Sequence, residues 1–160
     1  GIKIMTTTGL KVVQPYLFFS GRCEEAVNYY KTALGAEITA MMRFKDAPPM
    51  PAEQGGGEGC GPGNPSPDKI MHASFKIGQS EIMASDGCEE GKQSFQGFSL
   101  SIAVHAESEA DKIFGALSQG GKVVQPLIPT FFAPKFGMVE DKFGVGWMVI
   151  VVPPGGHGKA

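Results

Sequence analysis

Two segments show the spacing of apolar residues that is typical of an amphipathic helix. The first begins at Glu24 and is followed by Gly35, and the second begins at Ser108 and is followed by Gly120 and Gly121. Because apolar residues three and four apart share one helix face and glycine commonly ends a helix, the chain is predicted to contain two helices. Their apolar stripes comprise Ala26, Tyr29, Tyr30, Ala33 and Leu34 in the first and Ala110, Ile113, Phe114 and Leu117 in the second.

The segments around these helices are predicted to be strands. Leu100, Ile102 and Val104 alternate with small or polar residues, which is the pattern of a strand with one buried face. One strand precedes each helix and three follow it, so both halves have the order β-α-β-β-β. The predicted strands are 12–19, 37–44, 70–77 and 81–85 in the first half and 98–104, 123–125, 135–140 and 146–152 in the second.

The spacing of equivalent positions indicates an internal repeat with one insertion. The helix positions Ala26 and Ala110 are further apart than the hairpin glycines Gly78 and Gly144, by about the length of the segment 47–67, which is rich in glycine and proline. We therefore predict an α+β fold of two β-α-β-β-β modules, 12–90 with the insertion 47–67 and 96–152, within one compact domain. Each sheet has only one helix, so the modules should form a curved mixed sheet with a concave cleft.

Composition excludes several classes of partner. The 160 residues carry a formal net charge of −2 with Lys and Arg scattered, which disfavours nucleic acid and anionic membranes. The longest apolar run, 147–152, is too short to span a bilayer, and no signal peptide is expected. Cys23, Cys60 and Cys88 lack metal-site spacing, so we expect reduced thiols in a cytoplasmic protein.

Several motifs together carry a resemblance to a known family. They are Pro15-Tyr16-Leu17-Phe18-Phe19, the segment 25–37, Met71-His72-Ala73, the segment 82–86 and the segment 141–147. With these motifs the chain resembles the vicinal oxygen chelate superfamily, which includes glyoxalase I, bleomycin-resistance proteins and extradiol dioxygenases, and most closely its PhnB-like branch. The resemblance implies a glyoxalase-like fold and a homodimer. Some PhnB-like sequences are labelled demethylubiquinone methyltransferases, but this sequence has no strand followed by a glycine-rich nucleotide turn.

The resemblance also implies where a divalent metal would be held in related enzymes. The corresponding positions here are Gln14 or Pro15, Met83, Ser99 and Met148, and only Gln14 is a ligand of the usual kind. A thioether is soft and neutral, so two methionines remove the negative charge that holds a hard divalent cation. We therefore predict no metal and no cofactor, with both methionines lining an apolar pocket.

Strand alternation identifies further side chains for the cleft. His72 and Ser74 share one face of their strand, and His72 is either a general base or a hydrogen-bonded structural residue. Arg43 either meets an anionic ligand group or ends a strand in solvent. Glu140 is a catalytic candidate beside Asp141, which is predicted to form a turn. Tyr16, Phe18 and Ser85 complete the expected ligand-binding set.

Three functions follow from these residues. The first is a protein, enzyme or not, that binds a small, partly apolar molecule without the superfamily metal. The second is a metal-dependent lyase, isomerase or dioxygenase that uses Gln14, His72 and Glu140. The third is a homodimeric structural or regulatory protein, because eight strands in two units leave edges that a second chain would cover.

Overall fold

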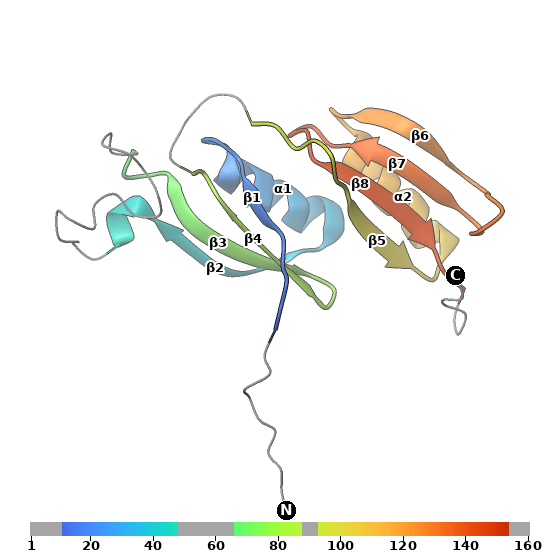
Figure 1. The fold of residues 1–160 in the computed structure, drawn as a ribbon, viewed down its shortest axis with the longest axis horizontal. Helices are drawn as coiled ribbons and strands as arrows, with labels where there is room; N and C mark the ends of the chain where they lie inside the picture. The colour runs from blue at the N-terminus through green and yellow to red at the C-terminus, as the bar shows by residue number, and fades with distance from the viewer. Residues whose placement is uncertain (1–10, 48–65, 88–92, 154–160) are drawn as a thin grey trace, which may run out of the picture.

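The computed structural model describes residues 11–47, 66–87 and 93–153. Each half of the chain has the order β-α-β-β-β (Figure 1). The first half contains β1 (Tyr16–Phe18), α1 (Cys23–Leu34), β2 (Glu37–Arg43), the short 3-10 helix η2 (Phe44–Asp46), β3 (Ile70–Ile77) and β4 (Ser80–Ser85). The second contains β5 (Leu100–Val104), α2 (Glu107–Ser118), β6 (Lys122–Ile128), β7 (Phe136–Glu140) and β8 (Gly146–Val151).

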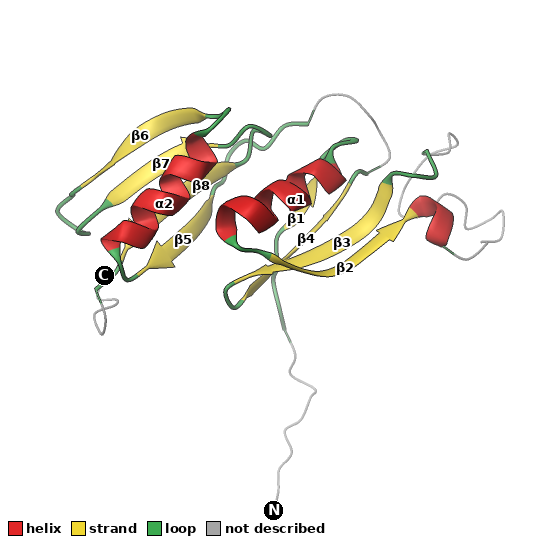
Figure 2. Ribbon diagram, turned by 180° about the vertical axis from the view of Figure 1, so that it is seen from behind, coloured by secondary structure: helices red, strands yellow, loops and turns green. Residues whose placement is uncertain are grey.

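The strands form two separate four-stranded sheets, ordered β1-β4-β3-β2 and β5-β8-β7-β6. In each sheet the first strand runs parallel to the last, and the other pairs are antiparallel. Helix α1 covers one face of the first sheet and α2 covers the same side of the second (Figure 2). This arrangement confirms the predicted α+β, glyoxalase-like fold class, with the sheets side by side and, among the described residues, no helix on their other faces.

Two strands differ from the prediction by more than two residues at one end. β1 begins only at Tyr16, and the segment before it contributes the Pro15 carbonyl, which accepts a hydrogen bond from the Met83 amide at 3.0 Å. β6 continues through Pro126, where the sequence pattern ended it. Proline is tolerated there because β6 is an edge strand with register irregularities around Gln125. Most of the predicted insertion, residues 48–65, lies outside the described residues.

The two halves share an aromatic core behind the sheets. Phe19 and Tyr30 of the first half pack against Phe143 and Trp147 of the second, with ring centroids 5.5–6.3 Å apart. All four side chains are essentially buried. Contacts of this kind supply both area burial and a preferred ring geometry, so this cluster fixes how the halves sit against each other.

A buried carboxylate completes the connection between the halves. Asp141 accepts hydrogen bonds from the amides of Phe143 and Val145, as expected of a turn former. Its other oxygen accepts bonds from the Tyr30 hydroxyl at 2.5 Å and the Trp147 indole N–H at 2.8 Å. A buried charge requires such partners, so Asp141 joins α1 to the second sheet as well as shaping its turn.

A second buried carboxylate, Asp86, organises the first half. It accepts hydrogen bonds from the backbone amides of Gly21, Cys23 and Ile70 at 2.7–2.9 Å. These bonds fix the turn that leads into α1 and hold it against β3. Cys23 is a free thiol buried at the start of the helix, and Cys60 and Cys88 lie outside the described residues. Within the described ranges, no helix has the length and hydropathy needed to cross a membrane.

Candidate functional site

The face of the first sheet opposite α1, called here the first open face, gathers most of the side chains expected to bind a ligand. Its members are Tyr16 and Phe18 of β1, His72 and Ser74 of β3, and Met83 and Ser85 of β4. The register places Tyr16 next to Met83 and Met83 next to Ser74, so these three form a row across the sheet. Strand alternation brings them together because every second side chain points to the same face.

His72 is held between two hydroxyl groups on this face. The Tyr16 hydroxyl lies 3.0 Å from Nδ1, and the Ser74 hydroxyl lies 3.3 Å from Nε2. The Tyr16 and His72 rings pack against each other with their centroids 5.6 Å apart, and the Phe18 ring packs on Tyr16 with a centroid distance of 5.1 Å. A neutral imidazole has one donor and one acceptor nitrogen, so one hydroxyl donates to the ring and the other accepts from it. Either nitrogen must give up a hydroxyl partner before it binds a metal ion.

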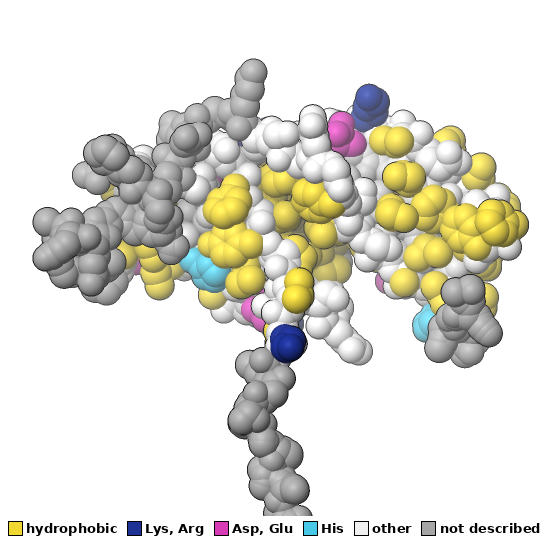
Figure 3. All heavy atoms as spheres, in the orientation of Figure 1, with side chains coloured by type: hydrophobic (Ala, Val, Ile, Leu, Met, Phe, Trp, Pro, Cys, Tyr) yellow, Lys and Arg dark blue, Asp and Glu magenta, His cyan; other side chains and the backbone are white. Residues whose placement is uncertain are grey.

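The second sheet has an open face of different character. Met138, Met148 and Ser101 lie side by side on β7, β8 and β5. Next to the sheet, Phe131 is fully exposed and Phe132 is about half exposed (52%). Hydrophobic side chains gather over both sheets on the side that faces the viewer in Figure 3. The second open face is therefore apolar, whereas the first combines apolar with hydrogen-bonding groups.

The residues at the expected metal positions do not fit a hard divalent cation. Met83 and Met148 lie on the open faces of β4 and β8, while Gln14 and Ser99 precede β1 and β5. These four offer two thioethers, an amide and a hydroxyl, with no negative charge. No group of three or more His, Cys, Asp and Glu that could hold a metal occurs among residues 11–47, 66–87 and 93–153. Glu140 is exposed at the end of β7, on the other sheet from His72.

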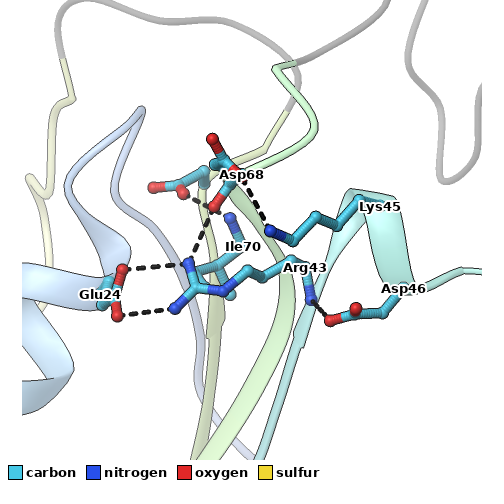
Figure 4. Close-up of polar contacts among 7 residues, drawn as sticks. Glu24, Arg43, Lys45, Asp46, Asp68 and Ile70 are labelled. Carbon is cyan, nitrogen blue, oxygen red and sulfur yellow. Dashed lines mark hydrogen bonds and ion pairs between the residues drawn. The ribbon is translucent and has the colours of Figure 1, made fainter.

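Arg43 does not join the residues of the first open face. The register shift between Ile38 and Ala40 reverses the alternation of β2, so Arg43 points to the helix side of the sheet. There its guanidinium donates to both Glu24 carboxylate oxygens at 2.7 and 3.0 Å (Figure 4). It also donates to the Asp68 carbonyl at 2.9 Å. The hydrogen bonds from Arg43 lower the pKa of Glu24 and raise that of Arg43. Arg43 therefore pairs with a carboxylate of α1 on the side away from the open face, because alternation from the start of β2 holds only as far as the bulge.

Two hollows lie beside the first open face. A groove of about 740 Å³ runs between the two halves and is lined by Gln14, the β3–β4 hairpin and β5. A smaller pocket of about 340 Å³, called here the linker pocket, is formed by β1 and the segment 93–98 that leads into β5. Sequence reasoning missed the linker pocket, although the two phenylalanines in an otherwise polar connection were a signal. Its lining is Tyr16, Leu17, Phe18, Ser20, Gln93, Ser94, Phe95 and Phe98.

Comparisons with known proteins agree with this architecture. The sequence profile of the family described as 3-demethylubiquinone-9 3-methyltransferase matches residues 11–150. Protein YjdN from Escherichia coli is 40% identical over 141 residues, which cover 88% of this chain and 95% of YjdN. The structure of protein PA1353 from Pseudomonas aeruginosa is 38% identical with a TM-score of 0.69, over 88% of this chain and 97% of that one. A PhnB protein from Bacillus cereus is 26% identical with a TM-score of 0.69, over 89% and 100% of the two chains.

Proposed function

Because the chain belongs to the family described as 3-demethylubiquinone-9 3-methyltransferase, the PhnB-like branch of the vicinal oxygen chelate superfamily, we propose that it binds a small, partly apolar molecule on its first open face without a divalent metal ion. The observation that carries this proposal is the hydrogen-bonded group of Tyr16, His72 and Ser74, which lies beside Phe18 and Met83. A few placed polar groups on an otherwise apolar surface are the usual equipment of a small-molecule site.

The hydrogen bonds of His72 define what such a ligand must offer. Both ring nitrogens already have hydroxyl partners, so the ligand meets the outer side of this chain of groups. A hydroxyl both donates and accepts hydrogen bonds, so the hydroxyl groups of this face suit a neutral ligand group that is either a donor or an acceptor. Apolar contact with Phe18 and Met83 then supplies burial. The proposal does not include methyl transfer, because the described residues form no parallel open sheet of the type that binds nucleotide cofactors.

A ligand screen by thermal shift tests the proposal. A ligand at 100 times its Kd stabilises a protein by about 2.7 kcal/mol, and the same ligand should lose its effect on H72Q. The matched control is H105Q, because His105 is an exposed histidine of the second half whose Nδ1 lies 2.6 Å from the Val152 carbonyl oxygen. The screen is repeated after dialysis against a chelator. Stoichiometric metal in the purified protein, lost in H72Q, would overturn the metal-free proposal in favour of a metal-dependent enzyme.

A homodimer is the second proposal, and the direction of the open faces supports it. Both sheets are covered by helices on the same side, so their open faces look the same way and one cannot cover the other within a chain (Figures 1 and 2). The exposed apolar side chains of the second half, called here the second-sheet patch, then need a cover. In a two-fold dimer this patch would lie over the first open face of the other copy. The patch comprises Val124, Ile128, Phe131 and Phe132.

Light scattering during size-exclusion chromatography tests the dimer. We expect the mass of two chains for the native protein and of one chain for I128K, which places a charge in the patch. The control E37K changes an exposed residue of edge strand β2, outside the patch, and should remain dimeric. A native protein that elutes as a monomer at concentrations up to the millimolar range would rule the dimer out.

The proposal places this dimer in the cytoplasm, where thiols stay reduced.

A further inference from the structure

The linker pocket lies directly beside the first open face and shares two side chains with it. Tyr16 and Phe18 of β1 line it on one element, and Phe98 lines it from the segment that leads into β5. Phe95 anchors the segment 93–98 to the core, because its ring packs against Phe19 with the two centroids 5.4 Å apart. The pocket is therefore built by β1 and by the connection between the two halves.

The walls of the pocket are aromatic and incompletely buried. The exposed fraction is 55% for Phe18 and 47% for Phe98. Exposed large aromatic side chains are costly to hydrate, and ring faces pack best against another ring in an offset or edge-on geometry. A volume of about 340 Å³ is at the lower end of the range for ligand pockets. A flat ring system of one or two rings matches both the walls and the size.

Gln93 adds a polar requirement to this apolar site. Its side-chain N–H group donates to the Phe143 carbonyl at 2.8 Å, which fixes which end of the amide is the carbonyl. Across the described ranges, the side-chain amide oxygen of Gln93 is the one buried side-chain polar atom that has no hydrogen-bond partner. A buried acceptor without a donor lowers the stability of the folded protein, and a donor that reaches it removes this cost. Because Gln93 belongs to the lining of the linker pocket, a donor group on a bound molecule would supply the missing partner.

From these observations we infer that the linker pocket binds a flat aromatic ring system carrying an N–H or O–H donor, which hydrogen-bonds the side-chain oxygen of Gln93 while its ring packs between Phe18 and Phe98. This inference rests on the proposed function, since it names the ligand class for an extension of the same site past Tyr16. It adds Gln93 and Phe98 as residues that determine specificity. The second-sheet patch has no part in it.

A matched pair of probes tests the donor requirement on the unaltered protein. Indole carries a ring N–H, and benzofuran has the same two-ring shape with an oxygen in its place. Nuclear magnetic resonance titration should show indole binding about tenfold more tightly than benzofuran, the effect of one hydrogen bond to a group otherwise left unpaired. Shifts should be confined to signals of the pocket lining. Equal affinities for the two probes, or no binding of indole, would overturn the inference.

Variants then assign the preference to its residues. In Q93L the tenfold preference should fall to about one, with benzofuran affinity unchanged. F98A should weaken both probes by the same factor, because it removes packing and leaves the acceptor. The control V12A changes an exposed side chain before β1, outside the pocket lining and the second-sheet patch, and should leave both affinities unchanged. A preference that persists in Q93L would contradict the role of Gln93, and the native-protein titration stands even where Q93L fails to fold.

The outcomes separate this inference from the proposed function. If screen hits that depend on His72 stabilise the protein while indole does not bind, the linker pocket is excluded and the first open face remains a ligand site. If indole binds with the expected preference and no ligand depends on His72, the pocket is a site of its own and the proposed function fails.

Discussion

The hydrogen bond between Tyr30 and Asp141 is expected to be a main support of the contact between the two halves. Y30F removes the hydroxyl that donates to the carboxylate at 2.5 Å and leaves the ring in place. Three other donors to Asp141 remain, so the charge stays partly satisfied. A hydrogen bond to a charged group is worth about 1.5–3 kcal/mol, and we expect the free energy of unfolding to fall by that amount.

Urea unfolding at neutral pH measures this loss, and the neighbouring residue supplies the control. Y29F removes the hydroxyl of a half-buried tyrosine that donates to the Ala116 carbonyl at 3.0 Å, a neutral bond worth about 0.5–1.5 kcal/mol. In a D141N background the cost of Y30F should drop below about 1 kcal/mol, because the charged acceptor is gone. A cost for Y30F under about 0.5 kcal/mol, or equal costs in both backgrounds, would refute this account of the contact.

Three further outcomes are expected. G137A should destabilise by about 1–3 kcal/mol in urea unfolding, because its new methyl group would lie 2.7 Å from the Phe114 ring, whereas G115A on a free helix surface should be neutral or stabilising by up to about 1 kcal/mol. Burial raises the pKa of Tyr29 to about 12, so its contribution to stability is complete below about pH 10 and is lost as the pH rises toward 12, and Y29F should flatten this part of a stability–pH curve. Burial, followed by the nearby Asp86 charge, raises the pKa of the Cys23 thiol, so the thiol should not react in the folded protein. Peptide mapping after treatment with a thiol reagent should find Cys23 unmodified until urea unfolds the protein. Modification of the native protein would contradict the burial of Cys23.

Local patterns were sufficient for most of the fold. The helix predicted from Glu24 and the strand 70–77 agree with α1 and β3 because the central apolar residues of each lie on the buried face, among them Ala26 and Tyr30 in α1 and Ala73 and Phe75 in β3. The same alternation placed His72 and Ser74 together. The prediction failed for β6 at Pro126, since the rule against proline in strands holds for interior strands and β6 is at an edge.

The features that sequence reasoning missed depend on groups far apart in the chain. Asp141 has a turn sequence, and nothing local indicates that the Tyr30 hydroxyl reaches it from the other half. Arg43 left the expected face because of one bulge, which no pattern of polar and apolar residues reveals. Gln93 and Phe98 lie in a connection with no periodicity, so their pocket exists only once β1 packs beside them. Long-range packing therefore decided the details of the site.

The contacts that unite the halves and the side chains available to a ligand lie on opposite sides of the layer of strands. Tyr30 and Asp141 lie on the helix side, and Tyr16, His72 and Met83 lie on the other. Mutations of Tyr16, His72 or Met83 that change ligand binding thus carry little risk for the contact between the halves, because none of these side chains belongs to the aromatic core. A lineage built on this plan is free to diversify its ligands one strand position at a time while the scaffold behind them stays constant.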